Sequence, residues 1–284
     1  MQSRRSLAGA IAGLGAALSL SPRAVAAQAT GPAPGESTLD RVRRTGVLRI
    51  SALPGEAPFF VKDPATGEWS GAAIDMAKNI AAALNVKLAY VEGTYATSVL
   101  DLQTNKSDLA FALNPTPQRA LAIGFTRPYY MHPFGYVAHT GFPARTWADL
   151  NDPKIRVVSL IGSLTDNLLA RYAPKAHVVA VKAGADGILM MQAGRADCII
   201  YGLIQALSVT ARAPQLQQVT LLRQPFVALP SAMGVQEEPD RRWRDFLDSW
   251  ADYNAGTRQI GAWMRSSLLA MGVQPSTIPA DADL

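Results

Sequence analysis

The chain has 284 residues, 49% of them hydrophobic, which is enough for one large or two small globular domains. Its single cysteine excludes an internal disulfide, and its three histidines are too far apart in the sequence for typical metal-ligand spacing. The formal net charge is +5, but the first 29 residues carry three arginines and no acid, so the remainder has a net charge of +2. This small excess argues against a nucleic-acid partner.

The first 29 residues have the layout of a secretory signal peptide. Arg4 and Arg5 form a basic start, residues 7–20 are small and apolar, and alanines recur over residues 24–29. The apolar run is shorter than the roughly 20 residues that span a bilayer. The arginine pair also resembles a twin-arginine export signal. We therefore expect a periplasmic mature protein, joined to the signal peptide by a polar linker over residues 30–38.

From residue 39 the chain alternates β-rich runs with helical patterns. In the predicted helix over residues 71–84, Ile74, Ala77, Ile80 and Leu84 share one face. A second helix is predicted over 97–105, and strands are predicted over 47–53, 86–92 and 108–113. Alternating strands and helices predict parallel pairing and a layered α/β fold.

A second series repeats this pattern after residue 150. Strands are predicted over 154–162, 177–181 and 196–202, and helices over 163–172, 184–194 and 203–211. Two extended runs, residues 134–141 and 231–238, bracket this series, and helices over 240–254 and 257–271 end the chain. We expect two α/β lobes joined by two crossover strands, with lobe 1 formed by residues 39–134 and 236–284 and lobe 2 by residues 135–235.

Arg119 lies just beyond the predicted strand 108–113, where ligands of open α/β sheets bind. Thr116 is a plausible N-cap and Pro117 a plausible first helical residue. The start of a helix favours an anion, so a cation there gains nothing from the helix dipole. A carboxylate held by two charged hydrogen bonds would complete the site. A solvated arginine or a structural ion pair is the alternative.

The segment Gly162 to Thr165 has the same character in the second series. Gly162 allows a sharp exit from the strand, and Ser163 or Thr165 can cap the next helix, which would point its start at the same cleft or form an ordinary turn. Enzyme motifs such as GxSxG, a Walker loop and HExxH are absent from the sequence. Cys198 lies within a predicted strand, where a buried and inert thiol is expected.

Two stretches together resemble a known family. "GVLRISALPGEAPFFVKDPATGEWSGAAIDMAKNIAAALNVKLAYVE" and "DLAFALNPTPQRALAIGFTRPYY" are similar to the family 3 bacterial extracellular solute-binding proteins, the periplasmic receptors of polar amino acid ABC importers. The resemblance extends over about residues 39–273. It implies a type II periplasmic-binding-protein-like fold whose two lobes close around a small carboxylate ligand by hinge motion. It also implies a monomer that delivers its ligand to a membrane permease, with no catalytic residue, cofactor or metal.

The resemblance also carries residue roles. Arg119 stands where the family's arginine binds the ligand's carboxylate, and Tyr95 looks like the aromatic residue that stacks on the ligand. Ser163 and Thr165 match the turn that helps to hold the carboxylate. The predicted binding set further includes Asn114, Phe59, Glu56 and Tyr201.

The departures from the family concern the amino group of the ligand. Gly202, with Tyr201 beside it, occupies the place of the aspartate that binds the ammonium group, and Leu53 occupies that of a first-lobe aspartate. A buried ammonium without a carboxylate partner is costly. The ligand is therefore expected to be an amine-free organic or aromatic acid, unless Glu56 replaces the missing acid and permits an amino acid.

Two other functions remain open. Periplasmic cyclohexadienyl dehydratases resemble this family and use a carboxylic acid in the cleft as a general acid. In this chain Asp166 or Asp186 would have to serve. A sensor or accessory binding protein that feeds no importer would show the same sequence features.

Overall fold

The computed structural model describes residues 35–213 and 215–278. The predicted signal peptide lies outside these residues. The predicted linker over residues 30–38 extends too far, because Ser37 already caps α1 (Thr38–Thr45) by accepting a hydrogen bond from the backbone N–H of Asp40 at 3.2 Å.

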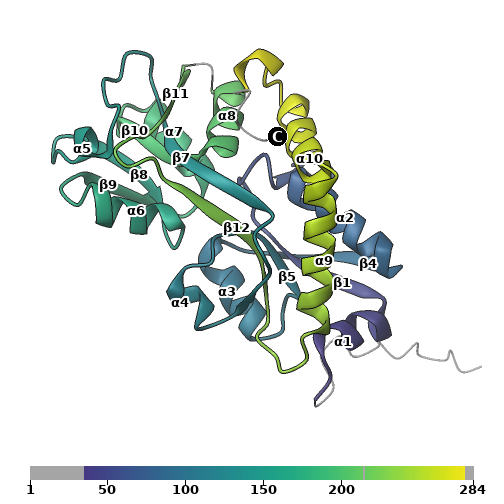
Figure 1. The fold of residues 1–284 in the computed structure, drawn as a ribbon. Coiled ribbons are helices and arrows are strands. Elements are labelled where there is room, and N and C mark those ends of the chain that lie inside the picture. The colour runs from purple at the N-terminus through teal and green to yellow at the C-terminus, as the bar shows by residue number, and fades with distance from the viewer. Residues whose placement is uncertain (1–34, 214, 279–284) are drawn as a thin grey trace, which may run out of the picture.

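A mixed sheet runs through the whole molecule (Figure 1). Its strand order is β4-β1-β5-β12-β7-β10-β8-β9, with β6 added to β12 and β11 to β7. The strands are β1 (Val47–Ala52), β4 (Lys87–Glu92), β5 (Leu109–Leu113), β6 (Gly124–Phe125), β7 (Tyr130–Ala138), β8 (Arg156–Leu160), β9 (His177–Val181), β10 (Cys198–Gly202), β11 (Gln218–Leu221) and β12 (Ala228–Val235), and β2 (Val61–Lys62) and β3 (Trp69–Ser70) form a separate hairpin. The predicted parallel pairing is confirmed for β1 with β4 and β5, and for β8 with β9 and β10.

The two long strands β7 and β12 join the two halves of the sheet. They pair antiparallel from Ala228 opposite Pro133 to Ser231 opposite Tyr130. Beyond this ladder β12 pairs with β5, and β7 pairs with β10 and β11. Both strands begin earlier than the predicted starts at residues 134 and 231. The sequence rules missed these starts because Pro133 and Pro230 lie within the ladder, and proline argues against a strand.

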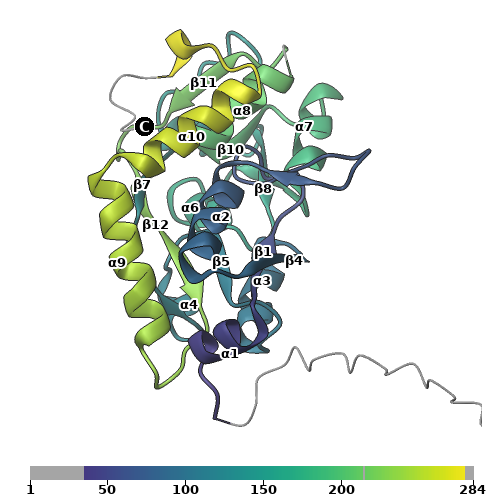
Figure 2. The ribbon, with the colours of Figure 1, turned by 90° about the vertical axis from the view of Figure 1, so that its right-hand side faces the viewer.

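Helices cover both halves of the sheet (Figure 2). The longer ones are α2 (Ala72–Leu84), α3 (Tyr95–Gln103), α6 (Leu164–Tyr172), α7 (Gly184–Gln192), α8 (Leu203–Arg212), α9 (Arg242–Gly256) and α10 (Gln259–Ala270), and the short ones are α4 (Pro117–Ala120), α5 (Trp147–Leu150) and a 3-10 turn (Pro275–Thr277). The helix predicted over 97–105 begins earlier, because Thr94 caps α3 by accepting from the N–H of Thr97 at 3.2 Å. Within the described residues, no helix combines the length and the apolar character that crossing a membrane requires.

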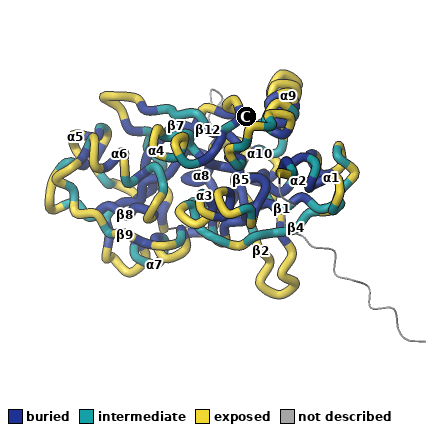
Figure 3. The backbone as a smooth tube through the Cα atoms, turned by 90° about the horizontal axis from the view of Figure 1, so that it is seen from below, coloured by how far each residue is buried: buried dark blue, intermediate teal, exposed yellow. Residues whose placement is uncertain are grey.

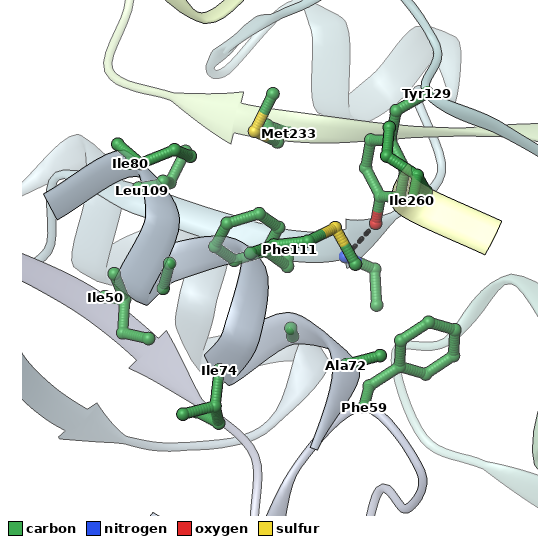
Figure 4. Packing of buried hydrophobic residues seen from close by; sticks show 14 of the residues in the cluster. Ile50, Phe59, Ala72, Ile74, Ile80, Leu109, Phe111, Tyr129, Met233 and Ile260 are labelled. Atoms are coloured by element: carbon green, nitrogen blue, oxygen red, sulfur yellow. Dashed lines mark hydrogen bonds between the residues drawn. The ribbon is translucent and has the colours of Figure 1, made fainter. Parts of the chain in front are cut away.

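The buried residues form separate apolar clusters along the sheet (Figure 3). In the first half, Ile50, Ile74 and Phe111 pack below Met233 of β12 (Figure 4). Helix α8 belongs to both halves: Ile204 is part of the first cluster, whereas Val209 is part of the cluster that contains Val137 of β7 and Ile199 of β10. This helix therefore connects the two halves in addition to the crossover strands.

A buried ion pair fixes the start of the chain to the sheet. Asp108 is 2% exposed and its carboxylate binds two guanidinium groups, that of Arg41 on α1 and that of Arg49 on β1, the latter at 2.6 Å. The indole N–H of Trp243 on α9 donates to the backbone carbonyl of Asp108 at 3.0 Å. Helix α1 and the neighbouring strand β1 therefore meet α9, which is distant in the sequence, at one residue.

We expect Asp108→Ala to lower the free energy of unfolding by about 3–5 kcal/mol, because it removes the carboxylate from buried cations. The matched control is Asp252→Ala, which removes a solvent-exposed ion pair with Arg127 and should cost less than about 1 kcal/mol. Urea unfolding of both variants measures the difference. Equal losses in the two variants would contradict the assignment of Asp108 as a structural anchor.

Candidate functional site

A pocket lies between the two halves, at the carboxyl ends of β5, β8 and β10, where ligands of α/β sheets bind. Its lining residues come from both halves and from β7: Tyr95, Ala112, Asn114, Arg119, His132, Phe134, Leu160, Ser163, Leu164, Thr165, Ile200, Tyr201, Gly202 and Gln205. The enclosed space measures about 30 Å³, which accommodates one or two water molecules. A wider surface groove of about 620 Å³ adjoins it and shares Asn114 and Leu164.

Six of the eight predicted binding residues line this pocket. They are Tyr95, Asn114, Arg119, Ser163, Thr165 and Tyr201. Phe59 does not line it: it is 1% exposed in the first apolar cluster, with its ring 6.1 Å from that of His132. Glu56 lies behind the pocket wall and faces a separate depression beside Tyr95. The part that these eight residues play in binding stays a prediction.

Arg119 is positioned by the turn that follows β5. Thr116 caps α4 by accepting from the N–H of Arg119 at 3.2 Å, and Pro117 is the first helical residue, as predicted. The Asn114 side chain ties the same turn to β12 by donating to the carbonyl of Pro230 at 2.7 Å. The Thr116 cap and the Asn114 hydrogen bond therefore set the direction in which the Arg119 side chain leaves the backbone.

The guanidinium of Arg119 binds backbone carbonyls from both sides of the pocket. Nη1 donates to Asn114 O at 3.1 Å, and Nη2 donates across the pocket to Gly162 O at 2.8 Å. Burial lowers the pKa of Arg119 from its usual value. Among the described residues, no carboxylate lies within ion-pair distance of it, and a guanidinium has five N–H donors. Donors therefore remain for an anion in the pocket.

The opposite wall is the turn between β8 and α6. Gly162 has a φ of +74°, and a Cβ there would lie 2.8 Å from the Cβ of Ala96, so this turn requires glycine. Ser163 is the N-cap of α6, and its hydroxyl lies 2.7 Å from that of Thr165. Asp166 accepts from the N–H of Gly162 at 3.0 Å and so stabilises the turn. The predicted sharp exit and the predicted cap are both confirmed.

A buried polar cluster stands behind the pocket. Glu56 is 4% exposed and accepts from the Tyr95 hydroxyl at 3.1 Å and from the Gln205 amide at 2.8 Å. The Gln205 amide also contacts the Tyr95 hydroxyl at 3.2 Å. Desolvation raises the pKa of Glu56 from 4.5 to about 7, against the opposing effect of its hydrogen bonds. Gln205 lies on α8, and Glu56 lies on the loop after β1. The cluster therefore joins the two halves.

The described lining of the pocket carries positive charge and no negative charge. Of the described residues that line it, Arg119 alone carries a charged side chain, and none is an acid. Asp166 and Asp186, the acids considered for a dehydratase, do not line it, and Asp186 is exposed. Within the described residues no group of three or more His, Cys, Asp or Glu side chains could hold a metal ion.

Two polar pocket residues escaped the sequence analysis, His132 and Gln205. His132 is a buried polar residue in an otherwise apolar strand, which is a usable signal for a functional position. Gln205 lies among apolar residues near the start of α8, in a buried turn of that helix.

The raised pKa of Glu56 predicts a pH dependence of stability. The folded protein keeps the Glu56 proton at pH values where the unfolded chain has lost it, between 4.5 and about 7. The free energy of unfolding should therefore fall by about 3 kcal/mol as the pH rises through this window and then level off. Glu56→Gln, which cannot ionise, should lack this fall.

Thermal unfolding at pH 5 and pH 8 measures the effect. The exposed Glu68→Gln variant is the matched control and should keep the wild-type pH dependence. An unchanged pH dependence in Glu56→Gln would show that Glu56 ionises normally in the folded protein.

Comparison with known proteins gives a family match over part of the chain. Residues 48–153 match the bacterial extracellular solute-binding proteins, family 3. The chain is 26% identical, over 78% of its length and 72% of the relative, to a probable amino-acid ABC transporter periplasmic-binding protein of Sinorhizobium fredii. It is 23% identical, over 76% of its length and 80% of the relative, to a cyclohexadienyl dehydratase of Pseudomonas aeruginosa.

The fold is also found among solved structures. An amino acid ABC transporter substrate-binding protein of Streptococcus pneumoniae, bound to L-arginine, superimposes with a TM-score of 0.75 at 19% identity. The superposition covers 82% of this chain and 98% of that one, and the shared architecture is the type II periplasmic-binding-protein fold. These findings agree with the resemblance found in the sequence: residues 48–153 match the bacterial extracellular solute-binding proteins of family 3, and the fold is that of a type II periplasmic binding protein.

Proposed function

We propose that this protein is a periplasmic receptor that binds a small carboxylate between two lobes and delivers it to the membrane permease of an ABC importer. The lobes are residues 39–134 with 236–284, and residues 135–235. The extracellular and periplasmic character of the family supports this location. The observation that carries the proposal is the Arg119 guanidinium, which faces a pocket whose described lining residues include no acid.

The ligand's carboxylate would take the donors that Arg119 now directs at the Gly162 carbonyl. Carboxylates match a guanidinium in geometry and form charge-assisted hydrogen bonds with it, stronger than those to a neutral carbonyl. The hydroxyls of Ser163 and Thr165, on the facing helix start, add donors beside the same position. The ligand's negative charge would then balance the only charged side chain of the described pocket lining.

Ligand entry requires the halves to separate. The present space of about 30 Å³ is too small for a compound with a carboxylate and a side chain. The hydrogen bonds that join the halves around it include Arg119 to Gly162 and Gln205 to Glu56. The β7–β12 ladder lies between the halves and supplies the place for hinge bending.

The ligand test measures thermal unfolding of the purified protein with two panels, L-amino acids and carboxylic acids without an amine. A ligand at a hundred times its Kd adds about 2.7 kcal/mol to the free energy of unfolding, which raises Tm by roughly 5–10 °C. Arg119→Ala should abolish this shift. The exposed Arg195→Ala variant, also an arginine in a turn, should retain it.

The two panels separate the two ligand classes. A shift with acids that lack an amine agrees with a pocket that has no acidic lining residue. A shift with amino acids that Glu56→Gln removes would show that Glu56 pairs with the ammonium group. No shift with either panel, or a shift that survives in Arg119→Ala, would contradict the proposal.

A dehydratase is the second candidate, because one relative is a cyclohexadienyl dehydratase and Glu56 has a proton to donate near neutral pH. In this structure Tyr95 and Gln205 separate Glu56 from the pocket, which favours the receptor. Incubation with arogenate and prephenate distinguishes the two. Product formation that Glu56→Gln abolishes would establish the enzyme. A sensor or accessory protein would bind through the same site, without a permease partner.

A further inference from the structure

His132 contributes an unsatisfied polar atom to the pocket. It lies on β7 and is 5% exposed, and its Nε2 has no hydrogen-bond partner among the residues that the structure describes. Phe134 stacks on its ring at 5.2 Å, and the rings of Tyr130 and Phe59 lie 5.6 and 6.1 Å away. This aromatic cluster holds the imidazole in one position.

The orientation of His132 depends on Gly202. A Cβ added to Gly202 would lie 1.6 Å from His132 Nε2, so the imidazole occupies the space in which a side chain at position 202 would begin. Gly202 is the N-cap of α8 and also lines the pocket. The glycine therefore makes room for the imidazole nitrogen at the pocket wall.

The imidazole is neutral in the folded protein. Desolvation lowers the pKa of His132 to about 4. A buried polar group without a partner is unfavourable, and a bound ligand that reaches Nε2 would remove this cost. A neutral imidazole accepts from a hydroxyl in one tautomer and donates to a carbonyl in the other.

The same wall is unfavourable for an amine. An ammonium can donate to a neutral imidazole, but no described lining residue offers a negative charge, and Arg119 is itself a cation. Burying a second cation without a counter-charge is costly. A hydroxyl or carbonyl carries no such cost. Arg119 and His132 line the same pocket, so one small ligand can meet both side chains.

We propose that His132 Nε2 binds a hydroxyl or carbonyl oxygen next to the ligand's carboxylate, so that the pocket selects 2-hydroxy and 2-oxo carboxylates over the corresponding amino acids. This inference rests on the proposed function, because it takes the carboxylate to be bound by Arg119. It assigns His132 as the residue that determines specificity.

The test uses acids that differ only at carbon 2. One series consists of 3-phenylpropionate, 3-phenyllactate, phenylpyruvate and phenylalanine, and the second of propionate, lactate, pyruvate and alanine. Calorimetric titration of the full-length protein should give Kd values for the hydroxy or oxo acid about three- to tenfold below those of the unsubstituted acid. The amino acid should bind more weakly still, by more than about tenfold.

Variants of His132 separate recognition from packing. His132→Phe fills the ring site beside Gly202 without polar atoms. It should erase the advantage of the hydroxy and oxo acids and leave the unsubstituted acid within about twofold of wild type. His132→Gln places an amide near the position of Nε2 and should restore part of the discrimination, which a purely structural role would not do.

Each outcome decides the inference. If His132→Phe keeps the wild-type discrimination, or if the amino acid binds best to wild type, the inference is wrong. If His132→Phe does not fold, His132→Gln and the wild-type ranking still test it, because equal Kd values across a series would contradict it. If binding requires Arg119 but the Kd does not depend on the substituent at carbon 2, this inference alone is wrong. The loss of all carboxylate binding would overturn the proposed function as well.

Discussion

A single, partly buried cation governs this site. The guanidinium of Arg119 lies between two backbone carbonyls, one from its own turn and one from the facing half of the molecule. Carbonyl dipoles offset only part of the cost of burying a charge. The surrounding polar groups, on Tyr95, His132 and Gln205, are neutral or shared among themselves. The described lining of the site therefore carries a positive charge without a counter-charge, which supports the proposed anionic ligand.

The contacts that close the pocket would compete with the ligand. Gly162 O accepts a hydrogen bond from Arg119 in this structure, and under the proposed function the same donor would turn to a bound carboxylate. Exchanging a neutral acceptor for a charged one strengthens the hydrogen bond. By contrast, the contact between Gln205 and Glu56 lies behind the pocket and can persist when a ligand binds. In the proposed cycle, the contact between Arg119 and Gly162 breaks when the ligand binds. The contact between Gln205 and Glu56 continues to hold the halves together.

The sequence predicts most of the fold because strands and helices alternate with clear periods. The strand at residues 177–181 has the predicted bounds, and the turn around Thr116 and Pro117 follows directly from capping rules. The strands β2, β3 and β6 have two residues each and leave no periodic signal. The extensions of β7 and β12 were missed because their prolines lie in the ladder between these two strands.

Six site residues follow from sequence patterns and the family resemblance, but the partnership of His132 and Gly202 does not. It depends on the antiparallel register that places Phe134 opposite Gly202, and on His132 sharing the face of Phe134 two residues away.

Cys198 gives the second half of the molecule a built-in chemical probe. It is the only thiol in the chain, fully buried on β10, with Ala138 of β7 on one side and Val157 of β8 on the other. Burial raises the pKa of this thiol well above its usual range, so the native protein holds almost no reactive thiolate. An alkylating reagent can reach the sulfur only when β10 separates from its neighbours. The rate of alkylation therefore reports how often this part of the sheet opens. The measurement needs neither a known ligand nor an engineered label.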